Sequence, residues 1–207
     1  MIKQTTQRET FLNGEGDAWF ERTKWQHQPN PFNFKLLKFL SNSKVQFSKA
    51  LEVGCSYGFL LDSIRKRKGC KCCGVDVSSK AICEGRVKYP LVSLEVGSSD
   101  SLPFPDSTFD FVLSSFLFHW IDRNYLYRSV SEIDRVLKLG GYLLLADFYS
   151  NNFLKVSYHH LPKEYVFTYK QDYTKLFLAS GLYDLVRLDV GKYDETDNYF
   201  ICLLRKK

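Results

Sequence analysis

The stretch that decides the fold of this chain is Leu51-Glu52-Val53-Gly54-Cys55-Ser56-Tyr57-Gly58. The apolar residues 50–53 predict a buried strand that stops at Gly54, and residues 57–67 have the apolar spacing of a helix. Gly54 lets the chain turn sharply and lets a ligand approach the backbone, whereas Gly58 allows close packing where the helix begins. The stretch therefore predicts a strand, a tight ligand-binding loop and a helix.

Further strands recur with room for a helix between them, over residues 72–77, 91–96, 109–115 and 142–148. The helix predicted over residues 122–137 is followed by Gly140-Gly141, which ends it. This alternation predicts an α/β fold with a Rossmann-like, seven-stranded, mostly parallel sheet and helices on both faces.

The rest of the 207 residues is assigned to the same single domain. Residues 1–45 are expected to form an N-terminal helical lid, and residues 46–150 the cofactor-binding core. Residues 151–207 are expected to form a substrate-side segment, with a helix over 172–179 and an antiparallel edge pair over 182–190 and 199–204.

Composition narrows the functional class. No apolar run approaches the length of a membrane span, and the polar start of the chain lacks a signal-peptide core, so we expect a cytoplasmic protein that does not bind membranes. Cys70, Cys72 and Cys73 lack a second, well-spaced ligand pair, so no metal site is expected.

Charge gives a softer indication. The net charge of the chain is +6. Its densest basic run is residues 65–71, which fit a solvated helix end. They are not interleaved with aromatic residues as in nucleic-acid-binding motifs. We therefore expect no nucleic-acid partner, a small and anionic acceptor, and a monomer or homodimer.

Two common nucleotide-binding loops do not fit the decisive stretch. A dinucleotide fingerprint would need glycine where Ser56 and Phe59 stand, and the Gly-Lys-Ser/Thr run of a P-loop is absent. Glu52-x-Gly54-x-Ser56-x-Gly58 instead resembles the first motif of class I S-adenosylmethionine-dependent methyltransferases, with Ser56 in place of the middle glycine. The resemblance implies S-adenosyl-L-methionine as cofactor, S-adenosyl-L-homocysteine as product, and cofactor contacts from Glu52, Gly54, Cys55, Ser56 and Gly58.

Later motifs extend the resemblance over residues 48–148. Asp76 ends the second strand, where the family holds the ribose hydroxyls; the alternative is that Asp76 only caps the next helix. Residues 96–104 resemble the adenine-binding loop, but Ser98 replaces its usual Asp and Asp100 is the nearby substitute. The cofactor contacts implied beyond the first motif are Asp76, Val77, Ser98, Ser99, Asp100, Ser114, Trp19 and Arg22.

His119 is the candidate catalytic residue. It follows the strand over 109–115, at the sheet end where the cofactor is expected, and histidine titrates near neutral pH. The alternative is a hydrogen-bonded structural histidine beside Trp120. His159, His160 and Tyr149 are expected to bind the substrate.

A narrower resemblance concerns the acceptor. Residues 16–22, 97–98, 146–149 and 158–169 are similar to methylases associated with pseudaminic acid biosynthesis. This implies a sugar or nucleotide-sugar acceptor of the nonulosonic acid type in surface glycan biosynthesis. The alternatives left open are methyl transfer to another small metabolite such as an amine or quinone, methyl transfer to nucleic acid or protein, and binding of the cofactor without catalysis.

Overall fold

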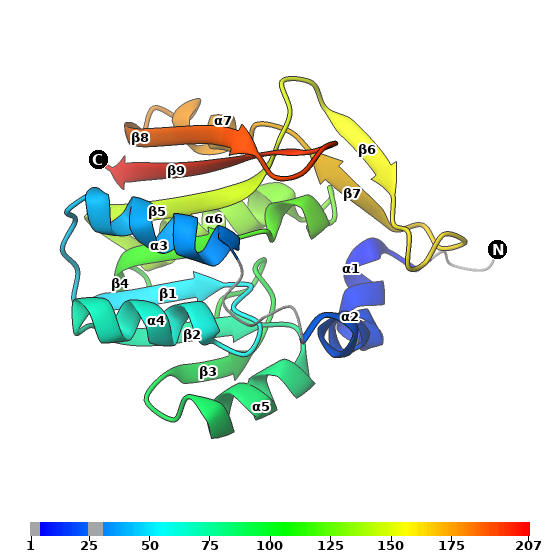
Figure 1. Cartoon of the computed structure of the whole chain (residues 1–207), viewed down its shortest axis with the longest axis horizontal. Helices are drawn as coiled ribbons and strands as arrows, with labels where there is room; N and C mark the ends of the chain where they lie inside the picture. Colours follow the sequence, from blue (N-terminus) through cyan, green and yellow to red (C-terminus); the bar gives the residue numbers. More distant parts are fainter. Residues whose placement is uncertain (1–4, 25–30) are drawn as a thin grey trace.

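A computed structural model of the chain describes residues 5–24 and 31–207. Within these residues the central sheet has seven strands in the order β3-β2-β1-β4-β5-β9-β8, as Figure 1 shows. The strands are β1 (Lys49–Val53), β2 (Lys71–Asp76), β3 (Ser93–Val96), β4 (Phe109–Ser115), β5 (Leu137–Tyr149), β8 (Tyr183–Lys192) and β9 (Asn198–Lys206). The α/β fold predicted from the sequence is confirmed.

The strands from β3 to β5 are parallel, and β9 enters antiparallel between β5 and β8. β4 lies in the middle of the sheet, and Phe109, Phe111, Val112 and Leu113 are fully buried. A strand that is apolar and buried along most of its length is expected where helices cover both faces. The strand order reverses between β1 and β4, so a crevice is expected at their carboxyl ends.

Helices cover both faces of the sheet. One face packs against α3 (Pro31–Asn42), α4 (Phe59–Lys68) and α5 (Ser79–Lys88), and the opposite face packs against α6 (Leu126–Val136) and α7 (Thr174–Leu178). α3 contributes Leu36 and Phe39, both buried, to the first layer. It therefore belongs to the core, and the expected lid boundary at residue 45 lies too late in the sequence.

The elements before α3 lie at the carboxyl ends of the strands, at the right of Figure 1. They are α1 (Gln7–Thr10), the π-helical turn η1 (Phe11–Glu15) and α2 (Gly16–Thr23). The Gln7 side chain donates to the carbonyl of Trp120 at 2.7 Å, and Asp17 accepts from the Ser78 hydroxyl at 2.7 Å. These bonds fix the N-terminal segment against the loops after β4 and β2. Trp25, expected in the same lid, lies outside the described residues.

Three local features differ from the sequence prediction. Helix α6 ends at Val136, and Gly140-Gly141 lies within β5 instead of ending the helix. Gly140 has a φ of +73°, which a glycine adopts without strain. The hairpin of β6 (Leu154–Ser157) and β7 (Phe167–Lys170) was not predicted from the sequence.

No helix in residues 5–24 and 31–207 combines the length and hydropathy needed to cross a bilayer.

Candidate active site

Two adjoining cavities open at the carboxyl ends of β1, β2 and β4. Their volumes are about 260 Å³ and about 80 Å³. The residues that line both are Phe11, Gly54, Asp76, Val77, Leu117 and Trp120. This is the topological switch point where ligands bind in open α/β sheets, and it contains the loop singled out from the sequence.

The loop after β1 forms the floor between the cavities. Gly54 has a φ of +78°, and a Cβ there would lie 3.1 Å from the Leu117 side chain. Ser56 also has a positive φ of +48°, which is uncommon for a residue with a side chain. Its backbone N–H donates to Asp76 Oδ2 at 2.8 Å, so the loop is held open against the end of β2.

Two carboxyl groups line the larger cavity beside this loop, Glu52 buried and Asp76 half-buried. Glu52 is the penultimate residue of β1, and its Oε2 is buried without a hydrogen-bond partner among the described residues. Burial raises its pKa well above the ordinary 4.5, and the charge of Asp76 raises it further. Asp76 accepts backbone N–H bonds from Ser56 and from Ser78 at 2.9 Å; burial nevertheless raises its pKa. An unpartnered buried carboxyl costs free energy unless a ligand completes it.

The smaller cavity is bounded by the loop after β3. Ser98 donates to Asp100 through its hydroxyl, and Arg8 of α1 donates to Asp100 Oδ2 at 2.9 Å. Burial alone would raise the Asp100 pKa, but these two hydrogen bonds bring it below the ordinary value. The Ser99 hydroxyl is 2.8 Å from that of Ser129, so it is tied to α6. This loop and Asp100 therefore meet the N-terminal segment at the cavity wall.

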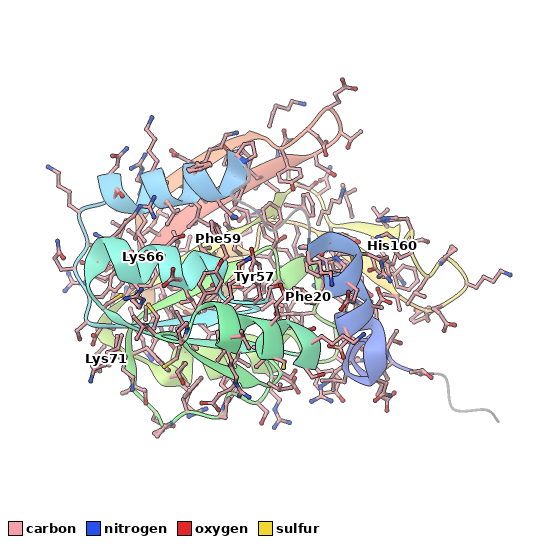
Figure 2. The ribbon with its side chains drawn as sticks, turned by 60° about the horizontal axis from the view of Figure 1, so that its bottom comes forward. Phe20, Tyr57, Phe59, Lys66, Lys71 and His160 are labelled. Atoms are coloured by element: carbon pink, nitrogen blue, oxygen red, sulfur yellow. The ribbon has the colours of Figure 1, made fainter. Side chains whose placement is uncertain are left out.

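Aromatic side chains wall the larger cavity. Phe116 lies directly after β4 and has a φ of +51°, which is strained for a bulky residue. Residues with strained backbone conformations cluster at functional sites. The ring centroid of Phe116 is 5.1 Å from that of Tyr193, in the turn between β8 and β9. Figure 2 shows Tyr57 and Phe59 close together near the centre of the molecule. The aromatic lining residues are Phe11, Trp19, Tyr57, Phe59, Phe116, Trp120 and Tyr193.

The larger cavity carries no basic side chain among the described residues that line it. Its carboxyl groups are those of Glu52 and Asp76. A ligand that bears positive charge next to these carboxyls, and apolar or ring surface next to the aromatic wall, suits this lining. In the described part of the chain, no three His, Cys, Asp or Glu side chains are grouped so as to hold a metal ion.

His119 does not line either cavity. It lies in a 3-10 turn after β4 with 2% of its surface exposed, and its Nδ1 is 2.7 Å from Asp147 Oδ1. Its ring also packs on Phe148 and Trp120. This geometry favours the structural histidine over the general base, because the ring supports the aromatic wall from behind.

The expected substrate residues also lie outside the cavities. Tyr149 donates through its hydroxyl to Asn151 at 2.8 Å. His159 and His160 are exposed on the β6–β7 hairpin with ring centroids 3.8 Å apart, and Figure 2 places His160 away from Tyr57 and Phe59. Their positions give no support to the substrate role expected from the sequence.

Three expected cofactor residues have other surroundings. Arg22 pairs with Glu15 and donates to the Tyr158 hydroxyl at 3.2 Å, so it joins α2 to the β6–β7 hairpin. Gly58 caps α4, and a Cβ there would lie 3.1 Å from Leu94, so its lack of a side chain serves packing. Ser114 is buried in β4, its hydroxyl without a partner in the described structure and outside both cavities.

The structure brings together the remaining expected residues at the cavities: Trp19, Glu52, Gly54, Cys55, Ser56, Asp76, Val77, Ser98, Ser99 and Asp100. It adds Phe11, Phe116 and Tyr193, which sequence reasoning missed. Phe116 lies in the run after β4 that drew attention to His119, so a signal was present. Tyr193 had none, because only the β8–β9 hairpin carries it to the site.

Residues 51–145 match a protein family described as a methyltransferase domain. Rat mitochondrial arginine-hydroxylase NDUFAF5 is 31% identical over 131 residues, which cover 58% of this chain and 37% of that protein. Demethylmenaquinone methyltransferase of Symbiobacterium thermophilum is 39% identical over 101 residues, which cover 44% of this chain and 39% of that protein. The alignments thus span about two fifths of the length of these curated relatives.

A solved structure of similar fold is 1,6-didemethyltoxoflavin-N1-methyltransferase of Burkholderia thailandensis, with bound 1,6-didemethyltoxoflavin and S-adenosylhomocysteine. Its TM-score is 0.74 at 13% identity, with 100% of this chain and 92% of that chain covered. At this identity the likeness concerns the fold alone. Residues 51–145 thus match the methyltransferase-domain family, and the described chain has the Rossmann-like methyltransferase fold.

Proposed function

We propose that this protein is an S-adenosylmethionine-dependent methyltransferase that acts on a small molecule. The observation that carries the proposal is the unpartnered Glu52 carboxyl beside the Gly54 loop, between cavities lined by Asp76 and by the loop after β3. S-adenosylmethionine has an ammonium group, ribose hydroxyls and an adenine ring. The two cavities offer a side chain or a loop of suitable chemistry for each of these groups. The family match over residues 51–145 supports the same activity.

Each counterpart follows from the chemistry of the side chain. Glu52 would hold the ammonium group, and Asp76 would accept from the ribose hydroxyls. The loop of Ser98, Ser99 and Asp100 would enclose the adenine ring. The bound cofactor supplies an electrophilic methyl group on a sulfonium sulfur.

The acceptor end of the larger cavity is assigned to Phe116, Tyr193 and Trp19. In a displacement of this kind, the chain contributes mainly by aligning the acceptor atom with the methyl group. The aromatic wall would hold a flat acceptor and exclude water. Burial raises the Tyr193 pKa, so this hydroxyl stays protonated and would orient the acceptor by hydrogen bonding.

Two acceptor classes remain candidates. A sugar or nucleotide-sugar acceptor rests on the narrower sequence resemblance, and aromatic rings are also suitable surfaces for sugars. An uncharged ring such as a quinone is favoured by the absence of basic residues from the described lining of the larger cavity. The name of one relative, demethylmenaquinone methyltransferase, contains a quinone of this class.

Ligand-induced stabilisation tests cofactor binding. S-adenosylhomocysteine at about a hundred times its dissociation constant is expected to add about 2.7 kcal/mol to the free energy of unfolding. The matched variant Gly54→Val is expected to lose most of this gain, since a side chain there fills the approach to the backbone. Stabilisation by NAD but not by S-adenosylhomocysteine would contradict the proposal.

Transfer of a labelled methyl group tests the acceptor. A panel of quinones, phenols, amines and nucleotide sugars is incubated with labelled cofactor and the purified chain. Labelled quinone or phenol would support the uncharged ring, and labelled nucleotide sugar would support the glycan role. Tight cofactor binding with no labelled product from any class would favour a cofactor-binding protein without catalysis.

A further inference from the structure

Strand β8 forms a long free edge of the central sheet. In the described structure it pairs with β9 on one side only, and Figure 1 shows it as the outermost strand. It is 10 residues long, whereas β3, at the opposite edge, has 4. A long edge presents unpaired backbone N–H and C=O groups that another strand can use, and proteins usually keep such edges short or charged.

This edge exposes apolar side chains between its charged ones. The exposed side chains of β8 include Leu185, Val186, Leu188 and Val190, which are 42–49% exposed. Leu188 and Val190 are opposite Cys202 and Phe200 in β9, so both lie on the α6–α7 face of the sheet. Exposed apolar residues gathered on one strand mark a surface for association.

The charges of β8 distinguish one pairing register from its neighbours. Arg187 and Asp189 flank Leu188, and both lie on the sheet face opposite to it. In an antiparallel pair of two identical strands centred on Leu188, each Arg187 is opposite the second copy's Asp189, giving two ion pairs. A pair centred on Arg187 or on Asp189 instead brings like charges together. Like charges directly opposite each other destabilise a strand pair.

We propose that two copies of this chain associate through β8, antiparallel and centred on Leu188, so that the two sheets become continuous. Leu188 contacts its counterpart on one face, and the two Arg187–Asp189 pairs form on the other. The bulge between Leu185 and Arg187 ends the regular pairing and brings Val186 beside the second copy's Val190. Within a single chain, Arg187 and Asp189 are 3.3 Å apart, so association exchanges one such pair in each chain for two pairs between the chains.

A charge-reversal experiment tests the register. Arg187→Asp and Asp189→Arg are prepared separately, and the dimer dissociation constant is measured by sedimentation equilibrium. Each variant alone places like charges at both pairs, so its dissociation constant is expected to rise at least about tenfold. When the two variants are mixed, both pairs between the chains become attractive, and a heterodimer is expected. Within each variant chain, residues 187 and 189 carry charges of the same sign. Only contact between the two chains therefore explains the recovery of association.

Controls separate association from folding. Thermal unfolding of both variants shows whether the monomer is intact, and Leu188→Lys provides a second disruption that leaves the charged pairs in place. Val87→Asp, which changes an 81% exposed residue of α5, is expected to leave the dimer unchanged. A wild-type chain that stays monomeric at all concentrations would overturn the proposal. A dimer that Arg187→Asp and Leu188→Lys leave intact would assign association to another surface.

Discussion

Replacing Glu52 by Gln should affect stability and cofactor binding in opposite directions. The change keeps the size of the side chain and removes its ability to ionise. Because burial and Asp76 raise the folded-state pKa of Glu52, the folded chain keeps a proton that the unfolded chain loses near 4.5. Between these two pKa values the folded state binds more protons, so the stability of the wild type falls as pH rises.

The pH dependence of the free energy of unfolding follows from the difference in bound protons between the folded and unfolded states. One extra proton on the folded state changes the free energy of unfolding by about 1.4 kcal/mol per pH unit. Glu52→Gln lacks this contribution, so its stability relative to the wild type should increase with pH above about 4.5 and level off beyond the raised pKa. Cofactor affinity should change the other way. Losing a hydrogen bond to a charged group costs about 1.5–3 kcal/mol, or about tenfold to 150-fold in the dissociation constant.

Two measurements check both signs. Urea unfolding from about pH 5 to about pH 8 gives the stability difference, and calorimetry with S-adenosylhomocysteine gives affinity. Calorimetry in buffers of different ionisation enthalpy should also show proton release when the wild type binds, but not when the variant does. Glu84→Gln, an exposed change on α5, is the control. The reasoning is refuted if Glu52→Gln matches Glu84→Gln in both pH slope and affinity.

Other parts of the molecule give further expectations. Asp76→Ala should weaken S-adenosylhomocysteine binding by about 1–3 kcal/mol in calorimetry, and unchanged affinity would leave Asp76 a role only in fixing the loop. His119→Ala should destabilise the fold by about 1–3 kcal/mol in urea unfolding, because the buried Asp147 carboxyl loses its hydrogen bond to the ring and keeps only backbone donors; a stable variant whose turnover alone falls by about 10²–10⁴ would restore the general-base hypothesis. Arg22→Met should raise proteolytic cleavage within residues 5–24, since it breaks the contacts with Glu15 and Tyr158; an unchanged cleavage pattern would show that other contacts hold this segment.

The sequence by itself determined the central strands and the Gly54–Asp76 part of the candidate site. Short, nearly continuous apolar runs predicted the central strands, because a strand that is buried on both faces requires apolar residues along most of its length. Gly54 and Asp76 were found because a tight turn and a strand-end carboxylate depend on residues adjacent in the chain. The expected starts of α6 and β5 were less accurate than their ends, and β5 begins before Gly140-Gly141 because these glycines are accommodated inside a strand.

The aromatic lining of the larger cavity was decided only by the tertiary structure. Phe11, Phe116 and Tyr193 meet at one cavity from three distant segments, and no local pattern encodes that meeting. Sequence reasoning chose His119 for its chemistry, but the fold places its ring outside both cavities and against the buried Asp147 carboxyl. The free edge of β8 likewise becomes visible only when the strand order is known, because alternation along a strand does not say which strand lies at the edge of the sheet.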